Sequence, residues 1–465
     1  MRTWTLVGLG LAEIGILATF GWSGAAHAFP WPGLAVFGAA FAVYAAAAWW
    51  LGRGTTEANA PRQTRTIWVF AVGMRLALLP LAPELSDDFN RYLWDGHVQL
   101  SGTNPYVHAP AAPELEPIRT EYHDAINNPA VPTIYPPVAQ IAFLVIAMAG
   151  SGLFAMKLLW LMCDLGTGWI LGRIARESGR NEAGVLLLYL WSPLLIIEVA
   201  WSGHLEPLGL LMLSAAIWAA TRAERSRDPA APARPADSSR LTALAGSARL
   251  AALAGSARLA ALAGSALALS ALTKFAPAAA IPALGRRLGW RPLLAFGVTG
   301  LALYAPYAGA GLDLFTGLRT YSEHWWFMKG AFVILESVAG DPLQARRLAG
   351  LSMFIVIGWT AYARFDLERA LFWILGAGMI LTPTLHPWYV LWMLPMAALR
   401  SARAWILLSG LAAIGYFGLG SYQATGDWAQ PGLARAALWI PFFVVLSIDA
   451  WARLRSAPSE PELVP

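Results

Sequence analysis

The chain has 465 residues, of which 57% are hydrophobic and only 13% are charged, with a mean hydropathy of +0.52. Soluble domains contain about 45–50% apolar and about 25% charged residues, so this composition excludes a soluble globular domain. The net charge is +5, but the basic residues lie in short segments between apolar runs and form no stripe with exposed aromatic residues. We therefore expect no nucleic-acid partner. The single cysteine, Cys163, excludes an intrachain disulfide.

Apolar runs of about 20 residues, the length that spans a membrane as a helix, recur along the whole chain. They begin near Trp4, Pro32, Thr66, Pro137, Leu153, Ala183, His204, Leu267, Pro292, Leu348, Arg369, Pro387, Arg403 and Leu433. Some are short or contain a charge, so we expect an all-α, polytopic transmembrane protein with about 13 spans that forms a single domain over 1–465. The first run also resembles a secretory signal, but a retained helix is favoured because further apolar runs follow at once.

Arginine-rich segments predict the orientation, because cytoplasmic loops carry an excess of Lys and Arg. Segment 53–65 is rich in arginine and is therefore predicted to be cytoplasmic. The helix that follows it would then cross the membrane to the outside, so 83–136 is predicted to be an external loop. Both 173–180 and 286–291 are predicted to be cytoplasmic, but the spans between them do not give a consistent count. One helix in this region is therefore expected to be re-entrant or interfacial.

A nine-residue unit occurs three times over 240–266, as RLTALAGSA followed twice by RLAALAGSA. Nine residues make 2.5 helical turns, so successive arginines fall on opposite faces and form no charged stripe. Three units are too few for a solenoid. We interpret 222–266 as a cytoplasmic linker that contains this tandem repeat, and a specific function for the repeat is the less favoured alternative.

The external loop 83–136 is the place where a polar substrate would be handled, because it is a long polar segment in an otherwise apolar chain. In its first part, Asp88, Arg91 and Asp95 fall on one face of a helix at positions i, i+3 and i+7. Apolar side chains fall on another face. This pattern predicts an interfacial helix with its carboxylates toward water, ended by Gly96 and Gly102.

A purely structural explanation of the same residues is open. Ser86 is a good N-cap, and Asp87 and Asp88 in the first helical turn would be favoured by the helix dipole. The functional explanation depends on position instead. Carboxylates directly after an outward-going helix lie at a low-dielectric boundary, which can raise a carboxylate pKa toward the range of a general base.

Six motifs follow one another in a fixed order. They are Asp88-x-x-Arg91-Tyr92-x-Trp94-Asp95-Gly96, Gly102-x-Asn104-Pro105-Tyr106, Tyr135-Pro136-Pro137, Trp201-Ser202-Gly203-His204-Leu205-Glu206-Pro207, Leu272-Thr273-Lys274 and Thr384-Leu385-His386-Pro387-Trp388-Tyr389. Together they resemble the polyprenyl-phosphate-sugar-dependent glycosyltransferases of the GT-C superfamily, and in particular the bacterial mannosyltransferase-like membrane proteins. The resemblance covers about 66–395. Many relatives have His-Asn-Asp where this chain has His204-Leu205-Glu206.

The resemblance implies inverting transfer of a hexose, with mannose favoured, from a polyprenyl-phosphate sugar donor to a lipid or glycan acceptor. It implies a bacterial inner (plasma) membrane with the active site on the extracytoplasmic face. In that family an aspartate of the first external loop is the catalytic base. Asp88 is the matching residue here, and Asp87 is the neighbouring candidate.

The other residues of these motifs are expected to bind substrate. They are Arg91, Tyr92, Asp95, Asn104, Tyr106, Tyr135, His204, Glu206, Lys274, His386, Trp388 and Tyr389. Because the leaving group is a phosphate, it needs cationic or hydrogen-bonding neighbours, for which Arg91, Lys274 and His386 are the candidates. Each has a structural alternative: Arg91 as an ion-pair partner, Lys274 as a snorkelling residue, and His386 as part of an aromatic belt.

No cofactor and no metal ion are expected, because His97, His108 and His123 lack ligand spacing and no glycine-rich nucleotide fingerprint precedes a helix. A secondary transporter or lipid flippase is the alternative function. It would use charges within apolar runs, namely Arg75, Lys157, Asp164, Glu198 and Lys274, but it should show paired repeats with interrupted helices, which the sequence lacks. A membrane scaffold is a third alternative. The oligomeric state is not indicated.

Overall fold

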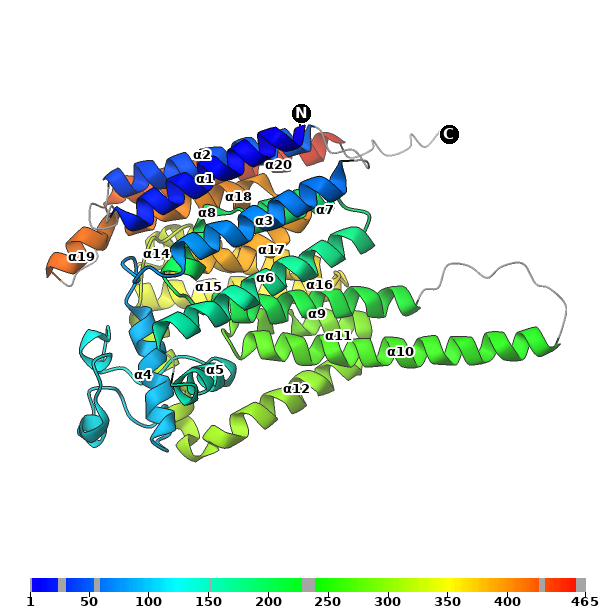
Figure 1. The fold of residues 1–465 in the computed structure, drawn as a ribbon. Coiled ribbons are helices and arrows are strands. Elements are labelled where there is room, and N and C mark those ends of the chain that lie inside the picture. Colours follow the sequence, from blue (N-terminus) through cyan, green and yellow to red (C-terminus); the bar gives the residue numbers. More distant parts are fainter. Residues whose placement is uncertain are drawn as a thin grey trace.

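The computed structural model describes residues 2–23, 31–53, 59–150, 152–227, 239–425 and 431–456, and within these ranges it contains helices and no strand. Long helices lie side by side along one direction, and α4 lies across one end of this bundle (Figure 1). The prediction of an all-α fold is confirmed.

The first half of the chain forms helices of very different length. They are α1 (Arg2–Trp22), α2 (Trp31–Gly52), α3 (Ala60–Leu78), α4 (Asp88–Leu100), α5 (Pro137–Met148), α6 (Leu153–Glu177), α7 (Glu182–Leu190), α8 (Pro193–Ile196), α9 (Glu206–Arg227) and α10 (Ser239–Ala271). Two short 3-10 helices, Pro113–Ile118 and His123–Ala125, lie in the loop between α4 and α5, and a π-helical turn, Ile197–Trp201, follows α8.

The second half continues the bundle. Its helices are α11 (Ile281–Leu288), α12 (Trp290–Tyr304), α13 (Thr316–His324), α14 (Phe332–Ala339), α15 (Pro342–Tyr362), α16 (Leu367–Leu381), α17 (Leu394–Arg400), α18 (Arg403–Leu411), α19 (Leu419–Thr425) and α20 (Gly432–Ser456). The 3-10 helices Ala276–Ala280, Ala305–Phe315, Pro387–Met393 and Ala412–Gly418 connect several of them.

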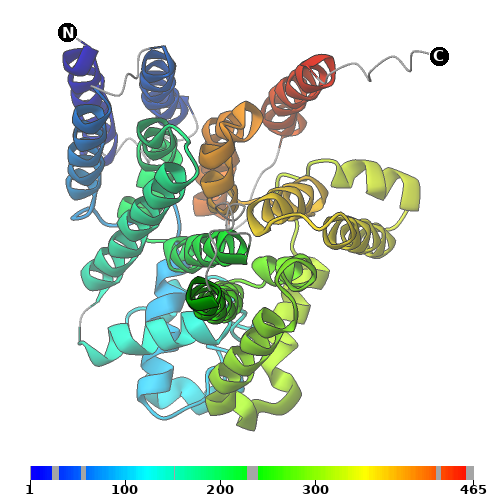
Figure 2. The same ribbon diagram turned by 90° about the vertical axis from the view of Figure 1, so that its right-hand side faces the viewer.

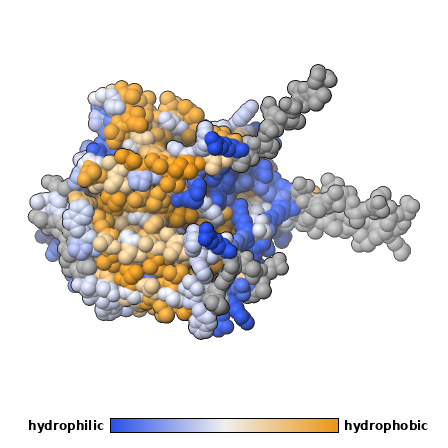
Figure 3. Space-filling view, turned by 90° about the horizontal axis from the view of Figure 1, so that it is seen from above, coloured by the Kyte–Doolittle hydropathy of each residue, from blue (hydrophilic) through white to orange (hydrophobic). Residues whose placement is uncertain are grey.

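The surface of the bundle is that of an integral membrane protein. Six helices of the described residues are long and apolar enough to cross a membrane, or seven if the bent pair Glu182–Leu190 and Pro193–Trp201 is one span. Large apolar side chains such as Met162, Leu301 and Ile440 are exposed on these helices, and one face shows a broad hydrophobic band with hydrophilic residues concentrated toward one end (Figure 3). The figure of about 13 spans stays a prediction, since several further helices are short or charged.

Ion pairs gather the arginine-rich segments at one end of the bundle. Glu177 at the end of α6 pairs with Arg222 of α9, Arg287 of α11 pairs with Glu224, and Glu368 binds Arg180 at 2.8 Å. Segments 173–180 and 286–291 therefore lie at the same end, opposite to α4 (Figure 1). The helix pair on either side of Pro193 is bent by 52°, and this bend lies in the part of the chain where the span count was inconsistent.

Helix α10 contains the tandem repeat. The three repeat units form one continuous helix that ends at Ala271, whereas the sequence predicted that a span would begin near Leu267. The assignment of 222–266 as a cytoplasmic linker stays a prediction. The C-terminal part of α10 packs against α9 and α12 (Figure 2). Small residues permit this packing: a Cβ built on Gly264 would lie 2.2 Å from the carbonyl oxygen of Pro292 in α12.

The repeat provides a matched pair of variants for this close contact. Gly255 and Gly264 occupy the same place in successive units, but a Cβ on Gly255 would have nothing within 4 Å. Gly264→Ala should destabilise the protein by about 1–3 kcal/mol because α10 and α12 must separate. Gly255→Ala should be neutral or stabilise by up to about 1 kcal/mol, since alanine is the better helix former. Thermal unfolding of both variants in detergent checks this, and equal melting temperatures would contradict the packing role.

Candidate functional site

A cavity of ≈ 950 Å³ lies at the end of the bundle where α4 begins, a volume that suits a small ligand. Its walls come from parts of the chain that are far apart in sequence. They are residues 83–91 before and within α4, 127–135 of the external loop, Lys274, 321–327 at the end of α13, 386–389, and Leu419 and Tyr422 of α19. Of the predicted site residues, eight line it: Asp87, Asp88, Arg91, Tyr135, Lys274, His386, Trp388 and Tyr389.

Asp87 and Asp88 face the cavity from the start of α4. The helix begins at Asp88, whose backbone N–H donates to the Ser86 hydroxyl at 3.2 Å. Asn127 donates its amide hydrogens to both carboxylates, to Asp87 Oδ1 at 2.6 Å and to Asp88 Oδ1 at 3.2 Å. Tyr422 adds a hydroxyl donor to Asp87 at 3.2 Å. Asp87 is thus held by two side chains, while the Asp88 side chain keeps 20% of its surface exposed.

The two neighbouring carboxylates have different surroundings. Burial, together with the negative charge of Asp88, raises the pKa of Asp87 to about 6, although the donors Asn127 and Tyr422 oppose this change. The expectation that this boundary raises a carboxylate pKa is met at Asp87. A pair of this kind takes up its first proton well above the pH at which an isolated aspartate does.

This pKa has a consequence for stability. It lies above the ~3.9 of an unfolded aspartate, so between these pH values the folded protein keeps a proton that the unfolded chain has lost. The stability that Asp87 contributes at low pH is therefore lost as the pH rises through about 6. Asp87→Asn does not titrate, so it should gain stability relative to the unsubstituted protein, by about 2 kcal/mol, between pH 4 and pH 7. Melting temperatures over a pH series in detergent measure this difference, and parallel curves would contradict it.

His204 lies behind Asp88 rather than in the cavity wall. It is fully buried, and its Nδ1 lies 2.8 Å from Glu198 Oε2 in an ion pair. Its Nε2 lies 3.1 Å from the Ser86 hydroxyl and 3.9 Å from Asp88 Oδ2. Burial, the largest single influence, lowers the pKa of His204, but Glu198, Glu206 and Asp88 together raise it by more, so the pKa is raised overall. The face of the imidazole ring stacks on the Trp388 ring, with the ring centres 4.1 Å apart.

Lys274 provides a positive charge in the cavity wall. Its ammonium group pairs with Glu206, which is fully buried and does not line the cavity. The Lys274 Nζ also lies 4.6 Å from the centre of the Tyr389 ring, a favourable cation–π position. Because an ammonium group has three donors, Lys274 can also bind an anion in the cavity.

His386 lies between aromatic rings and, unlike Lys274, is uncharged. Its ring stacks on Phe327 at 4.7 Å and on Trp388 at 4.6 Å. Burial, with help from the charges of Lys274 and His204, lowers the pKa of His386 to about 3. The imidazole is therefore neutral at physiological pH, so it can offer an N–H donor to a ligand but not a positive charge.

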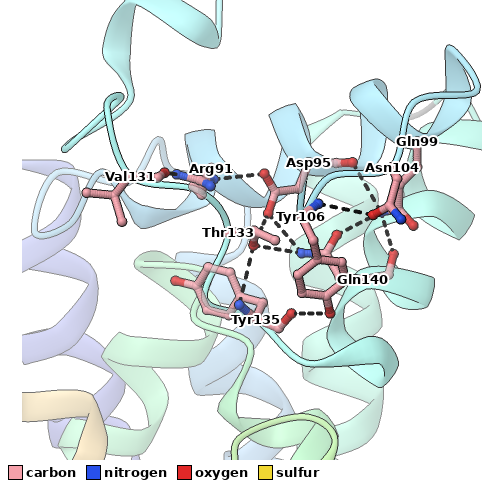
Figure 4. A network of polar contacts seen from close by, with 9 residues as sticks. All are labelled: Arg91, Asp95, Gln99, Asn104, Tyr106, Val131, Thr133, Tyr135 and Gln140. Carbon is pink, nitrogen blue, oxygen red and sulfur yellow. Dashed lines mark hydrogen bonds and ion pairs between the residues drawn. The ribbon is translucent and has the colours of Figure 1, made fainter. Parts of the chain in front are cut away.

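A buried polar network fixes the external loop on α4 (Figure 4). Asp95 accepts hydrogen bonds from Arg91 at 2.8 Å, from Thr133 at 2.6 Å and from Gln140 at 2.9 Å. Arg91 also donates to the carbonyl oxygen of Val131 at 3.0 Å. The prediction that the polar face of this helix points to water is wrong, because Asp95 and Arg91 are only 2% and 8% exposed.

Four further predicted binding residues support the loop instead of lining the cavity. Tyr106 donates its hydroxyl to the carbonyl oxygen of Tyr135 at 2.7 Å, and Asn104 donates to the carbonyl oxygen of Tyr307 at 3.2 Å (Figure 4 shows the first contact). Tyr92 is buried, with its ring stacked 4.9 Å from Phe143. Together with Asp95, these residues hold the wall in place.

Helix α4 also continues through Gly96, where the sequence predicted its end. A Cβ at Gly96 would lie 2.3 Å from the carbonyl oxygen of Phe143 in α5. The glycine therefore permits the close crossing of α4 and α5 and does not break the helix. Gly102, at φ +86°, does follow the helix end, as predicted.

Other cavity residues were not anticipated from the sequence. They are Ser86 as a partner of His204, and Asn127, Tyr321, Trp325, Phe327 and Tyr422 in the walls. The aromatic run that begins at Trp325 is a signal that could have been noticed in the sequence. Asn127 and Tyr422 lie in no motif, and only the folded chain brings them to Asp87.

Comparisons with known proteins indicate the family to which the chain belongs. Residues 13–285 match a family model described as "Alpha-(1->6)-mannopyranosyltransferase, N-terminal domain". Over 155 residues the chain is 29% identical to the Alpha-(1->6)-mannopyranosyltransferase A of Corynebacterium glutamicum, a match that covers 32% of this chain and 30% of that relative's length. No solved structure matches the chain. Because the family model spans more than half of it, the chain belongs to the alpha-(1->6)-mannopyranosyltransferase family.

Proposed function

We propose that the protein is a membrane glycosyltransferase that transfers a hexose, with mannose favoured, from a polyprenyl-phosphate donor to a lipid or glycan acceptor. The observation that carries this proposal is the pair of carboxylates, Asp87 and Asp88, in a cavity at one end of a membrane-embedded bundle. The membrane is proposed to be the bacterial inner membrane, with the cavity on its outer face, because the arginine-rich segments lie at the opposite end.

In this proposal Asp88 is the general base. An acceptor hydroxyl oxygen attacks the anomeric carbon of the donor sugar while Asp88 takes the hydroxyl proton. The bond between that carbon and the phosphate oxygen breaks, and its electron pair leaves with the phosphate. Attack from the face opposite the leaving group inverts the anomeric centre, so a β-linked donor would give an α-linked product, the linkage in the name of the Corynebacterium relative.

The leaving phosphate needs donors more than it needs an acid. Lys274 supplies a charge, His386 supplies a neutral N–H donor, and the cavity surface of Arg91 adds a second cation. Aromatic side chains of the wall, among them Trp325 and Tyr389, offer faces on which a sugar ring or the first lipid units can pack. These roles are proposals that rest on the position of each residue in the cavity.

His204 is proposed as a positioning residue for Asp88. Glu198, fixed by a hydrogen bond from Tyr416 at 2.5 Å, holds Nδ1 of His204 and so directs Nε2 toward Ser86 and Asp88. The Nε2 atom of His204, 3.9 Å from Asp88 Oδ2, so limits the positions that the Asp88 carboxylate can take. His204 reaches the reaction only through Asp88, which departs from the role of substrate contact expected from the sequence.

The substitution His204→Gln tests this role by comparing kcat with KM. Glutamine can still donate to Ser86, but it loses the imidazole contacts with Glu198 and Trp388, so Asp88 should be held less firmly in place. The value of kcat should fall by about 10- to 100-fold, because a misplaced general base takes the proton less effectively. KM for the donor should change little, because His204 does not line the cavity. An unchanged kcat would show that His204 only supports the fold.

The donor class is tested with the purified full-length protein in liposomes. Polyprenyl-phosphate mannose should support formation of a mannosylated product from an added membrane glycolipid extract, whereas a mannose nucleotide supplied alone should not. Transfer from the nucleotide would overturn the donor assignment. Movement of lipid-linked sugar across the bilayer with no glycoside formed would instead support the flippase alternative.

The structure offers that alternative less support. Arg75 and Asp164 form a buried ion pair, and Lys157 donates to the carbonyl oxygen of Leu81. Neither group lines the cavity, and of the five intramembrane charges in the described residues only Lys274 does. A pathway built from these charges would need them to face a common space.

A further inference from the structure

A second, smaller cavity of ≈ 200 Å³ lies at the end of the bundle opposite to α4. It is lined by the end of α9, by the last turn of α11 and by the second residue after the end of α15. The lining residues are Glu224, Arg227, Arg286, Arg287, Leu288 and Arg364. Four guanidinium groups face one carboxylate, so the cavity attracts anions. We call it the arginine cavity.

Two of its arginines have partners in the protein. Arg227 donates to the carbonyl oxygens of Arg287 at 3.3 Å and Leu288 at 2.6 Å, which end α11. Arg287 pairs with Glu224 at 3.0 Å and donates to the carbonyl oxygen of Arg364 at 3.3 Å. These contacts suit cations at the C-terminal ends of helices, and they hold the cavity in shape.

The other two arginines have donors to spare. The side chains of Arg286 and Arg364 are exposed, and neither makes a hydrogen bond or ion pair with any residue in the described ranges. Ten N–H donors in total therefore face the cavity or the solvent beside it. Guanidinium groups arranged in this way match the oxygens of a phosphate.

Arg364 also occupies a backbone position that favours glycine. Helices α4, α5 and α6 are each followed, one residue after the cap, by a glycine of positive φ, namely Gly102, Gly150 and Gly179. At the same position after α15 the chain has Arg364, at φ +51°. A side chain in this conformation costs about 1 kcal/mol relative to glycine, so the guanidinium group is kept at a cost in stability.

The surroundings of the arginine cavity are those of a lipid headgroup. Trp290, which starts α12 directly after the cavity residues, is 62% exposed, and Tyr362, two residues before Arg364, is 84% exposed. Aromatic side chains of this kind mark the membrane interface. Exposed apolar residues, such as Leu294 on α12 and Ile355 on α15, continue from there along the bundle.

We propose that the arginine cavity binds the phosphate of an anionic membrane lipid, whose acyl chains lie along the exposed apolar surfaces of α12 and α15. Phosphate oxygens would accept hydrogen bonds from Arg286 and Arg364. The site lies at the opposite end of the molecule from Asp88 and does not depend on sugar transfer.

The test uses the full-length protein purified in detergent and native mass spectrometry with phosphatidylglycerol as the probe. The variant Arg286→Gln/Arg364→Gly should weaken phosphatidylglycerol binding by ~10- to 30-fold, because two charges next to the phosphate are removed. Arg364→Gly alone should not lower the melting temperature, since glycine suits the backbone there. Arg369→Gln is the matched control, because Arg369 is exposed at the same end but lies outside the cavity.

Three outcomes would overturn the proposal. Equal loss of binding in Arg369→Gln would mean general attraction between a basic surface and an acidic lipid. If the unsubstituted protein bound phosphatidylcholine as well as it binds phosphatidylglycerol, the cavity would not distinguish an anionic lipid from a zwitterionic one. Displacement of the lipid by glycerol phosphate at similar concentration would make this a site for a soluble anion. If Arg364→Gly lowers the melting temperature, Arg286→Gln alone decides the question.

Discussion

Asp88→Asn should lower the rate of sugar transfer by at least about 100-fold while leaving the protein folded. A general base contributes roughly 10²- to 10⁴-fold to the rate, and an asparagine of the same shape cannot take the acceptor proton. The hydrogen bond from Asn127 and the backbone contact with Ser86 at the start of α4 can both be kept. The measurement is transfer of labelled mannose from polyprenyl-phosphate mannose in liposomes, with the melting temperature recorded alongside.

Two comparisons make this result specific. Asp124→Asn removes a carboxylate from the same external loop, but the Asp124 side chain is 90% exposed and does not line the cavity, so its rate should stay within about twofold. Asp87→Asn should keep far more activity than Asp88→Asn. If Asp88→Asn is as active as Asp124→Asn, Asp88 is not the base, and a loss confined to Asp87→Asn would move that role to its neighbour.

The second large effect is expected in the interior of the bundle. Arg75 of α3 and Asp164 of α6 form an ion pair at 2.5 Å in which both side chains are fully buried. Arg75 also donates to the carbonyl oxygens of Ala71 and Leu190, so it joins α3 to α6 and α7. Arg75→Leu should destabilise the protein by about 3–5 kcal/mol, because it leaves the carboxylate of Asp164 buried without its partner.

A double variant separates the cost of the lone charge from the value of the pair. Arg75→Met/Asp164→Leu removes both charges and should recover most of the stability that Arg75→Leu loses. Arg319→Leu is the surface control: Arg319 pairs with Glu323 on α13, its side chain is 80% exposed, and the expected change is below about 1 kcal/mol. Unfolding in detergent micelles measures all three. A double variant as unstable as Arg75→Leu would mean that the pair contributes directly.

The membrane class and the all-α fold could be predicted from the sequence because they depend on composition and run length, which need no partner. The faces of α4 could not. Periodicity correctly grouped Arg91 with Asp95, but it could not tell which face meets another part of the chain. Thr133 and Gln140 satisfy Asp95 from the loop and from α5, so the polar face is buried. Gly96 was misjudged for the same reason, since the contact that requires it lies in α5.

The site could be predicted in part. The motifs found Asp87, Asp88, Lys274 and His386, which lie in one cavity although up to 299 positions separate them in the chain. Asn127 and Tyr422 could not be predicted as site residues, because a single polar residue in a loop or a short helix has no periodicity or spacing that distinguishes it. His204 was found, but its role depends on Glu198, whose position inside an apolar run suggested a transport pathway and whose ion pair is visible only in three dimensions.

The repeat units differ in their packing, because Gly264 of the last unit contacts α12 closely whereas the equivalent Gly255 of the middle unit has no neighbour within 4 Å of a built Cβ. The close contact between α10 and α12 at Gly264 lies in the last unit, and α10 ends soon afterwards at Ala271. Adding or removing a unit upstream would lengthen or shorten the helix by about 13.5 Å and turn its N-terminal end by half a revolution, but the packed face would keep its register. A change in the number of units would thus alter how far the helix extends at the end of the bundle opposite to α4, and it would leave the end with the large cavity unchanged.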